Sequence, residues 1–161
     1  MDIRKTTEAD LEEVMSIYAD ARRFMEESGN HRQWPEDYPY EFIIREDIDK
    51  GLSHVCVLDG EILAVFYFDL GPDNTYDKID GSWLDSKPYG VVHRIARKNT
   101  EKAKGAGAFC LGWCYEKTKN IRIDTHRDNL PMRRLLEKLG YTYCGTIWIE
   151  TGAERYAYHK I

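Results

Sequence analysis

The sequence predicts a mixed α/β (α+β) fold, in which about seven strands form a central, largely antiparallel sheet flanked by four helices. Apolar periodicities give the element order β-α-α-β-β-β-α-β-α-β-β. Asp59-Gly60, between two β-rich runs, indicates a hairpin and therefore antiparallel early strands. A later strand, a Gly-containing loop and a helix begin a β-α-β-α unit. A meander followed by such a unit favours a mixed sheet with helices packed on it.

The first third of the chain predicts one short strand and two helices. Asp2–Lys5 forms the strand, and Thr7 is placed to cap a helix that ends at Ser28-Gly29-Asn30. A second helix covers residues 39/40–50. One face of the first helix is buried, because apolar residues recur there at helical spacing: Leu11, Val14, Met15, Tyr18 and Met25.

The middle of the chain predicts a hairpin, a long loop and a strand–loop–helix unit. His54–Leu58 and Glu61–Leu70 are the hairpin strands. Residues 71–88 are rich in turn residues, and a loop of this length is often functional. Tyr89–Ala96 is the central strand, and Gly105–Lys119 is the helix that follows it.

The last third predicts a strand, a helix and a terminal antiparallel pair. Ile121–Thr125 is the strand, and Asp128 or Asn129 caps the helix after it. Tyr141–Ile149 and Arg155–Lys160 are the paired strands. Their tyrosine-rich surfaces are candidates for a homodimer interface.

Composition and charge indicate one ordinary globular domain over residues 1–161. At 161 residues the chain is long enough to bury well over half of its unfolded surface. A net charge of −5 argues against a nucleic-acid partner, which selects a basic surface. No apolar run has the length of a membrane span, and residues 1–4 begin no secretory signal, so we expect a cytoplasmic protein without a membrane partner.

The four cysteines predict neither a metal site nor a disulfide framework, since their spacing fits neither pattern. We interpret them as reduced and mostly buried thiols: Cys56, Cys110, Cys114 and Cys144.

The stretch Lys102–Ala108 predicts a phosphate-binding loop. It lies between a strand and a helix N-terminus, and its glycines let a ligand come close to the backbone. The first N–H groups of a helix lack intrahelical partners, and the helix dipole favours negative charge there. A phosphate-bearing ligand is therefore expected at this loop.

Two stretches give this loop a more specific meaning. Ile95-Ala96-Arg97 is followed without a gap by Lys98–Gly107, at the place of an x-P-x-x-R/Q-x-x-G-x-G/A loop. Residues 129–141 are placed like an N-x-x-A-x-x-x-Y-x-K-x-G-F motif. In this order and at this separation, they resemble the GCN5-related N-acetyltransferase (GNAT) family over essentially the whole chain.

The resemblance implies the GNAT fold and acetyl-CoA as the acyl donor. In such proteins the fourth strand splays from the fifth, and its free backbone groups bind the pantetheine arm. Loop N–H groups bind the pyrophosphate, and the next helix contacts pantetheine. The cofactor-binding residues that it implies are Ile95, Ala96, Arg97, Lys102, Ala103, Lys104, Gly105, Ala106, Gly107, Ala108, Asn129 and Met132.

The sequence departs from the family pattern at one chemically important position. Leu136 stands where many members carry a Tyr that protonates the departing CoA thiolate. The group that protonates the thiolate is therefore unassigned, and the candidates are a water molecule, Tyr141 and Tyr143. Arg97, Asn99 and Lys102 also replace common family residues, but Lys102 keeps the positive charge of the loop.

His93 is the candidate catalytic base. An amine must lose a proton before it attacks a thioester, and His is the side chain that titrates near neutral pH. His93 lies two residues before Ile95, so we expect both on one face of the strand. In the aralkylamine branch of the family a matching His is the base; the alternative is a hydrogen-bonded structural His. His126 is a weaker candidate, because its surroundings suit a loop that places Asn129.

Four aromatic residues in loops and at a strand start are candidates for the acceptor wall: Trp34, Tyr38, Trp83 and Tyr89. Each would equally suit the edge of the core. Asp80 and Asp85 are candidates for attracting an ammonium group, although loop aspartates are more often turn residues. The acidic net charge is compatible with a cationic acceptor.

We interpret the chain as an acetyl-CoA-dependent N-acetyltransferase. Its acceptor would be a primary amine of a small molecule, an amino acid derivative or a peptide N-terminus. We favour direct transfer, because Cys110 and Cys114 lie on the helix after the loop at positions expected to be buried. The alternative is a non-catalytic acyl-CoA-binding sensor, which is suggested by Leu136 at the position of the usual catalytic Tyr. A dinucleotide-binding fold fits less well, since the single Gly pair follows the fourth strand rather than the first.

Overall fold

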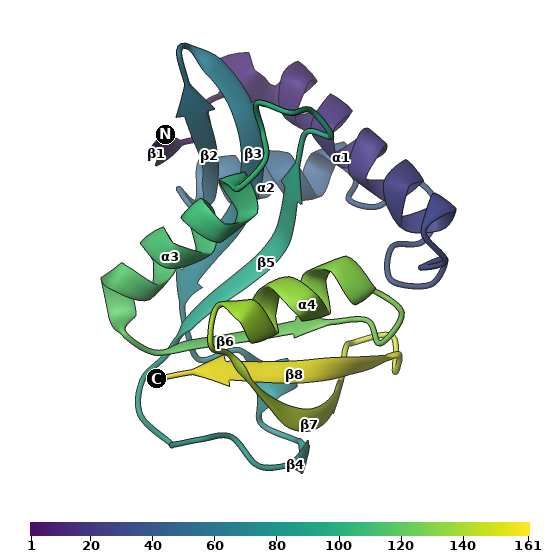
Figure 1. Ribbon diagram of the computed structural model, residues 1–161, viewed down its shortest axis with the longest axis vertical. Helices are drawn as coiled ribbons and strands as arrows, with labels where there is room; N and C mark the ends of the chain where they lie inside the picture. The colour runs from purple at the N-terminus through teal and green to yellow at the C-terminus, as the bar shows by residue number, and fades with distance from the viewer.

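The computed structural model describes residues 1–161 and contains one eight-stranded sheet with the strand order β1-β2-β3-β5-β6-β8-β7-β4 (Figure 1). The strands are β1 (Asp2–Lys5), β2 (Ser53–Leu58), β3 (Glu61–Leu70), β4 (Asp80–Gly81), β5 (Gly90–Arg97), β6 (Ile121–Thr125), β7 (Thr142–Trp148) and β8 (Glu154–Lys160). The helices are α1 (Leu11–Glu27), α2 (Glu41–Asp49), α3 (Ala106–Thr118) and α4 (Leu130–Lys138), with short 3₁₀ turns η1 (Glu8–Asp10) and η2 (Asn74–Tyr76). All strand pairs are antiparallel except β5 with β6.

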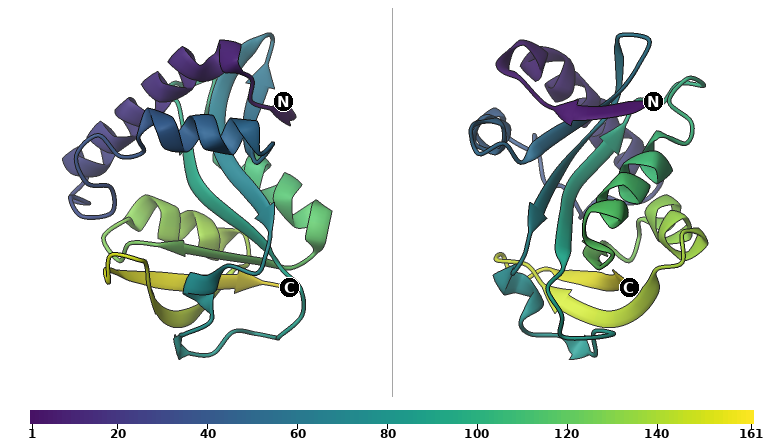
Figure 2. Two further views of the ribbon diagram at one scale, coloured as in Figure 1. Left: turned by 180° about the vertical axis from the view of Figure 1, so that it is seen from behind. Right: turned by 90° about the vertical axis from the view of Figure 1, so that its left-hand side faces the viewer.

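The helices cover the two faces of the sheet, as Figure 2 shows in the side view. Helices α1 and α2 lie on one face, where Val14 and Ile44 pack against strand residues such as Val65. Helices α3 and α4 lie on the other face, where Leu111 and Leu136 are buried. The four cysteines are buried and form no disulfide, in agreement with their predicted role as core thiols. None of the helices combines the length and the apolar composition needed to cross a membrane.

The predicted fold is confirmed, and two local differences have clear causes. The loop over residues 71–88 contains an additional strand, β4, which pairs with β7. This pairing brings Gly81 and Gly145 so close that a Cβ on either would lie 2.0 Å from a backbone carbonyl oxygen. In addition, η1 precedes α1, so Thr7 does not cap α1 directly. The Asp10 carboxylate accepts from the Thr7 N–H at 2.8 Å and stabilises this turn.

Strands β5 and β6 separate soon after they meet, and this separation opens the sheet. They pair only at Gly90–Ile121 and Val91–Arg122, although β5 continues to Arg97. A bulge contributes, because Arg94 has a positive φ of 49° and the β3–β5 register shifts there. The Arg94 carbonyl accepts from the Tyr18 hydroxyl at 2.9 Å instead of from a neighbouring strand. The backbone of β5 therefore diverges from β6, as Figure 1 shows.

Candidate active site

A cavity of about 830 Å³ lies where β5 leaves β6. Its walls come from the loop before α2, the loop after β3, strands β5 and β6, the start of α4 and the β7–β8 turn. Of the residues predicted from the sequence, it brings together six: Trp34, Tyr38, His93, Ile95, Asn129 and Met132. The proposed base therefore shares one space with residues from both the predicted donor site and the predicted acceptor site.

His93 is held by a carboxylate that sequence reasoning missed. Its Nε2 lies 2.7 Å from Asp73 Oδ2, and Asp73 also accepts from the N–H and hydroxyl of Thr75 at 2.9 and 2.7 Å. Burial alone would raise the pKa of Asp73, but the hydrogen bonds from His93 and Thr75 lower it to about 2. An ionised carboxylate only accepts hydrogen bonds, so Nε2 carries the proton that it shares with Asp73. In the neutral ring the free lone pair is therefore on Nδ1.

A second carboxylate, Asp124 on β6, lies on the other side of the ring. Its Oδ2 is 3.9 Å from His93 Nδ1 and accepts from the Tyr76 hydroxyl at 2.7 Å. Burial, and then the Asp124 charge, raise the pKa of Tyr76, so this phenol stays a donor. Asp73 and Asp124 both line the cavity. Together they form an acidic end that can attract an ammonium group next to Nδ1.

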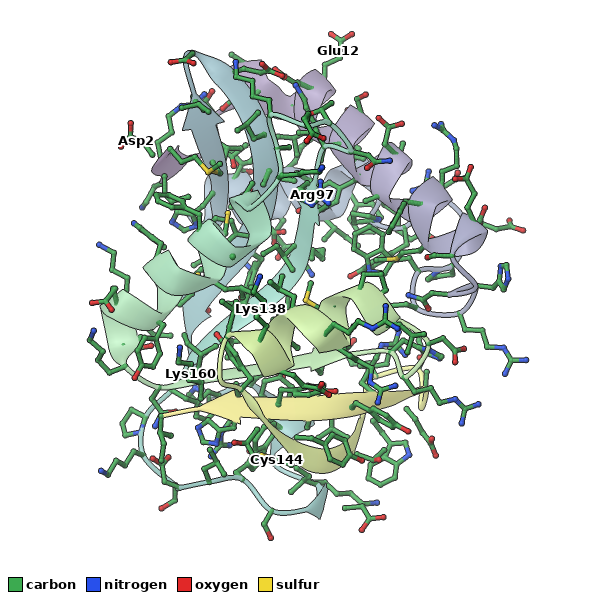
Figure 3. All side chains as sticks on the ribbon, in the orientation of Figure 1. Asp2, Glu12, Arg97, Lys138, Cys144 and Lys160 are labelled. Atoms are coloured by element: carbon green, nitrogen blue, oxygen red, sulfur yellow. The ribbon has the colours of Figure 1, made fainter.

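The predicted pantetheine contacts divide into two groups. Ile95, Asn129 and Met132 line the cavity, whereas Ala96 is buried against α1. Figure 3 shows Arg97 at the far end of β5, and its guanidinium donates to the Lys98 carbonyl at 2.9 Å. Asn129 is already engaged, because its Oδ1 caps α4 at the Met132 N–H and its Nδ2 donates to Gln33 Oε1 at 2.9 Å. The ends of the Asn129 side chain therefore connect α4 to the loop before α2.

The loop before α3 offers fewer free donors than its length suggests. The N–H groups of Ala103, Lys104 and Ala106 donate to turn carbonyls at 3.1–3.2 Å. Those of Gly105, Gly107 and Ala108 have no partner within the protein. Gly105 precedes the helix with a positive φ of 82°, a backbone conformation that glycine adopts without strain.

Both lysines of this loop are paired with carboxylates. Lys102 Nζ lies 2.8 Å from Glu61, and Lys104 Nζ lies 2.7 Å from Glu101. An anion that bound here would compete with these exposed glutamates for the lysines. Such exposed pairs are weak, so exchanging partners costs little.

Trp83 and Tyr89 do not line the cavity, so the structure does not place them in an acceptor wall. Both rings pack against the guanidinium of the buried Arg122, whose central carbon lies 4.4 Å from the Trp83 ring centroid and 4.0 Å from that of Tyr89. Trp83 Nε1 also donates to the Tyr76 carbonyl, and the Tyr89 hydroxyl accepts from the Asp73 N–H at 3.0 Å. They therefore stabilise the loop that carries Asp73.

The two loop aspartates suggested for an ammonium group also lie outside the cavity. Asp85 accepts from the Asn120 side-chain amide at 3.0 Å, and Asp80 pairs through its backbone with β7. Asp73 and Asp124, rather than Asp80 and Asp85, are the carboxylates that line the cavity.

The residues considered for thiolate protonation are also outside the cavity. Leu136 is fully buried in the core between α4 and the sheet. Tyr141 is buried with its hydroxyl unpaired, and burial raises its pKa. Tyr143 is half exposed and packs against the rings of Tyr156 and Tyr158 on β8. His126 Nδ1 accepts from the Asp128 N–H at 3.0 Å, as expected for a residue that shapes its loop.

The polar cavity residues that sequence reasoning missed include Gln33, Asp73, Arg94, Asp124 and Arg155. Asp124 and Arg155 carried a weak signal, since each is a charged residue within a strand. Gln33 connects the elements, because its Oε1 accepts from Asn129 and its carbonyl accepts from Arg155 at 2.8 Å. No group of three or more His, Cys, Asp or Glu side chains is arranged to hold a metal ion.

Comparisons with known proteins agree with this architecture. No protein-family model matches the chain, and no curated protein matches it significantly. Among solved structures, a GNAT-family acetyltransferase from Streptococcus agalactiae is 33% identical, with a TM-score of 0.90 over 99% of this chain and 94% of that one. A putative acetyltransferase from Staphylococcus aureus is 23% identical, with a TM-score of 0.72 over 99% and 98% of the two chains. A ribosomal-protein-alanine N-acetyltransferase from Brucella melitensis is 16% identical, with a TM-score of 0.65 over 100% and 99%.

The two more distant likenesses concern the fold alone, whereas the first combines sequence identity with nearly complete coverage of both chains. This likeness, with the sequence motifs and the splayed β5–β6 pair, shows that the chain belongs to the GNAT family of acetyltransferases.

Proposed function

We propose that this protein is an acetyl-CoA-dependent N-acetyltransferase that acts on a primary amine of a small molecule, an amino acid derivative or a peptide N-terminus. One observation carries the proposal. His93, oriented by Asp73, lines the same cavity as the predicted donor-site residues Ile95, Asn129 and Met132 and the predicted acceptor-site residue Trp34. The unpaired N–H groups at the N-terminus of α3 suit the pyrophosphate of the donor. The absence of disulfides is compatible with action in the cytoplasm.

The chain's own groups account for the proton transfers of direct acetylation. Asp73 and Asp124 attract the acceptor ammonium, and Nδ1 of His93 accepts its proton while Asp73 holds Nε2. Acetyl-CoA supplies the thioester, and the backbone N–H of Ile95 or Ala96 is the candidate that polarises its carbonyl. We assign protonation of the departing thiolate to water, because Leu136 has no acidic proton and neither Tyr141 nor Tyr143 lines the cavity.

The test is an assay of acetyl-CoA with a panel of amines, in which release of the CoA thiol is measured together with the acetylated product. We expect turnover with at least one primary amine and none with tertiary amines. Tight acetyl-CoA binding without turnover on any amine would instead favour the second candidate, a non-catalytic acyl-CoA sensor. The fully buried Leu136 at the usual Tyr position is the observation that favours this candidate.

Acetyl transfer is expected to leave no acetyl-enzyme. Hydrogen bonding to Cys56 and burial raise the pKa of Cys110, and burial raises that of Cys114, so neither is a ready nucleophile. Both thiols are fully buried outside the cavity. Intact-protein mass spectrometry after incubation with acetyl-CoA and no acceptor should show the unmodified mass. An acetyl-cysteine would contradict direct transfer.

Gly105→Ala is expected to raise the KM for acetyl-CoA about tenfold with a smaller change in kcat. A Cβ at this position meets nothing within 4 Å, but the positive φ of 82° costs a non-glycine residue roughly 1–2 kcal/mol. The loop can relax that strain by moving the N–H groups away from the pyrophosphate. Steady-state kinetics measures the effect, and Gly29→Ala is the matched control, with an open surrounding and a φ of 91° after the end of α1. Equal effects of both variants on this KM would contradict the role of the loop.

A further inference from the structure

Arg155 on β8 is a buried arginine without a carboxylate partner. Only 6% of its surface is exposed, and it makes no ion pair. Its guanidinium donates to the backbone carbonyls of Gln33 and Glu154 at 2.8 and 2.9 Å. Burial lowers its pKa, and the charge of Asp124 opposes that effect. A desolvated cation whose hydrogen-bond acceptors are all neutral is costly to bury, so a functional reason for Arg155 is worth seeking.

Two other arginines near the cavity, the partly buried Arg94 and the buried Arg122, have partners for their charge that Arg155 lacks. Arg94 pairs with Asp47 at 2.7 Å. Arg122 is enclosed by the rings of Trp83 and Tyr89 and donates to the Asp85 carbonyl at 2.8 Å. Arg155 lines the cavity, is more deeply buried than Arg94 and has no carboxylate at ion-pair distance, so its guanidinium retains capacity to bind an anion there.

The sheet register places Arg155 on the same face as the acidic end of the cavity. Asp124 pairs with Ala157, and alternate residues of a strand share a face, so Arg155 and Asp124 lie on one face. Val91 pairs with Arg122 in the parallel β5–β6 ladder, which puts His93 on that face as well. The base with its carboxylates and the arginine thus lie on one wall of the cavity.

The surroundings of Arg155 are positively charged on balance. A smaller cavity of about 240 Å³ shares Arg32, Ala153 and Arg155 with the main one and adds Arg127 and His126. Glu154 is its single carboxylate. Glu150 is the acidic side chain that the β7–β8 turn contributes to the main cavity. The end of the site away from His93 therefore suits a negative group better than a positive one.

We propose that the acceptor is an amine that also bears a carboxylate, as α-amino acids and their derivatives do. Its ammonium group would lie beside His93 Nδ1 and the Asp124 carboxylate, and its carboxylate would bind the Arg155 guanidinium. A planar guanidinium with free N–H groups matches a carboxylate in geometry and charge. This inference rests on the proposed function and narrows its substrate class. It disfavours polyamines and other acceptors with cations at both ends.

The first experiment uses the unaltered enzyme. Each α-amino acid of a panel is compared with its carboxamide and with its decarboxylated amine, and kcat/KM is measured by CoA release. We expect kcat/KM to be roughly 10- to 100-fold higher for the free acid, the range of a hydrogen-bonded charged group. Turnover restricted to amines without a carboxylate would overturn this inference alone. No turnover on any amine would overturn the proposed function instead.

The second experiment connects the preference to Arg155. In Arg155→Met the ratio of kcat/KM for acid over carboxamide should fall towards one, and in Arg155→Lys it should fall only partly. Arg23→Gln is the control for net charge, because Arg23 is exposed on α1 and pairs with Asp20. Circular dichroism and Tm show whether each variant is folded. An acid preference that persists in folded Arg155→Lys and Arg155→Met would overturn the assignment of Arg155.

Discussion

His93→Ala is expected to lower kcat at least about 100-fold, because a positioned general base typically contributes 10²- to 10⁴-fold. Asp73 fixes the ring through Nε2 at 2.7 Å, so the substitution removes both the proton acceptor and its alignment. The measurement is the pH–rate profile of kcat/KM with a good amine. The pH dependence that a general base contributes to the wild-type profile should disappear in the variant. An unchanged profile in both His93→Ala and His93→Gln would remove His93 from the mechanism.

Asp73→Asn separates orientation from proton acceptance. An amide can still contact Nε2, so we expect a loss of kcat smaller than that of His93→Ala. The Asp73 carboxylate also contributes to the stability of the fold, and this contribution depends on pH. Because the pKa of Asp73 is about 2 in the folded protein and about 3.9 in unfolded chains, its contribution is fully present above pH 4 and is lost as pH falls towards 2. Acid unfolding of Asp73→Asn should therefore depend less on pH in this window.

The sequence predicted the fold because its signals are local. Asp59-Gly60 encodes the hairpin within a few residues, and the glycines before α3 mark a loop that leads into a helix. His93 and Ile95 lie on one strand, so their meeting in one cavity needs no long-range information. The family pattern then supplied the site of the donor.

The rest of the site depends on contacts between residues far apart in the chain, for which a single sequence carries no signal. Asp73 lies in a turn-rich loop where an aspartate predicts only a turn, yet it meets His93 on β5. The sequence around Trp83 does not indicate which way its side chain points, and in the structure the ring packs against Arg122 rather than lining the cavity. Arg94 has a positive φ because it lies in a β-bulge, and no glycine or proline at this position in the sequence predicts that bulge.

The Asp47–Arg94 pair is expected to dominate the stability of the cavity wall. Asp47 on α2 and Arg94 on β5 are both largely buried, with Oδ2 and Nη2 2.7 Å apart, while Arg94 Nε has no partner. Burial raises the pKa of Asp47 despite the neighbouring guanidinium, so the pair is not itself a strong source of stability. Removing one partner has a different consequence. It leaves the other charge desolvated and unpaired.

Asp47→Ala should therefore lower the free energy of unfolding by about 3–5 kcal/mol, the cost typical of breaking a buried ion pair. Urea unfolding and Tm measure the loss. Glu46→Ala, on the same helix, is the control, since its exposed pair with Lys50 should leave Tm unchanged. Adding Arg94→Met to Asp47→Ala should restore part of the lost stability, because the double variant no longer buries an uncompensated charge. A double variant less stable than Asp47→Ala would show that Arg94 stabilises the bulge in β5 independently of its partner.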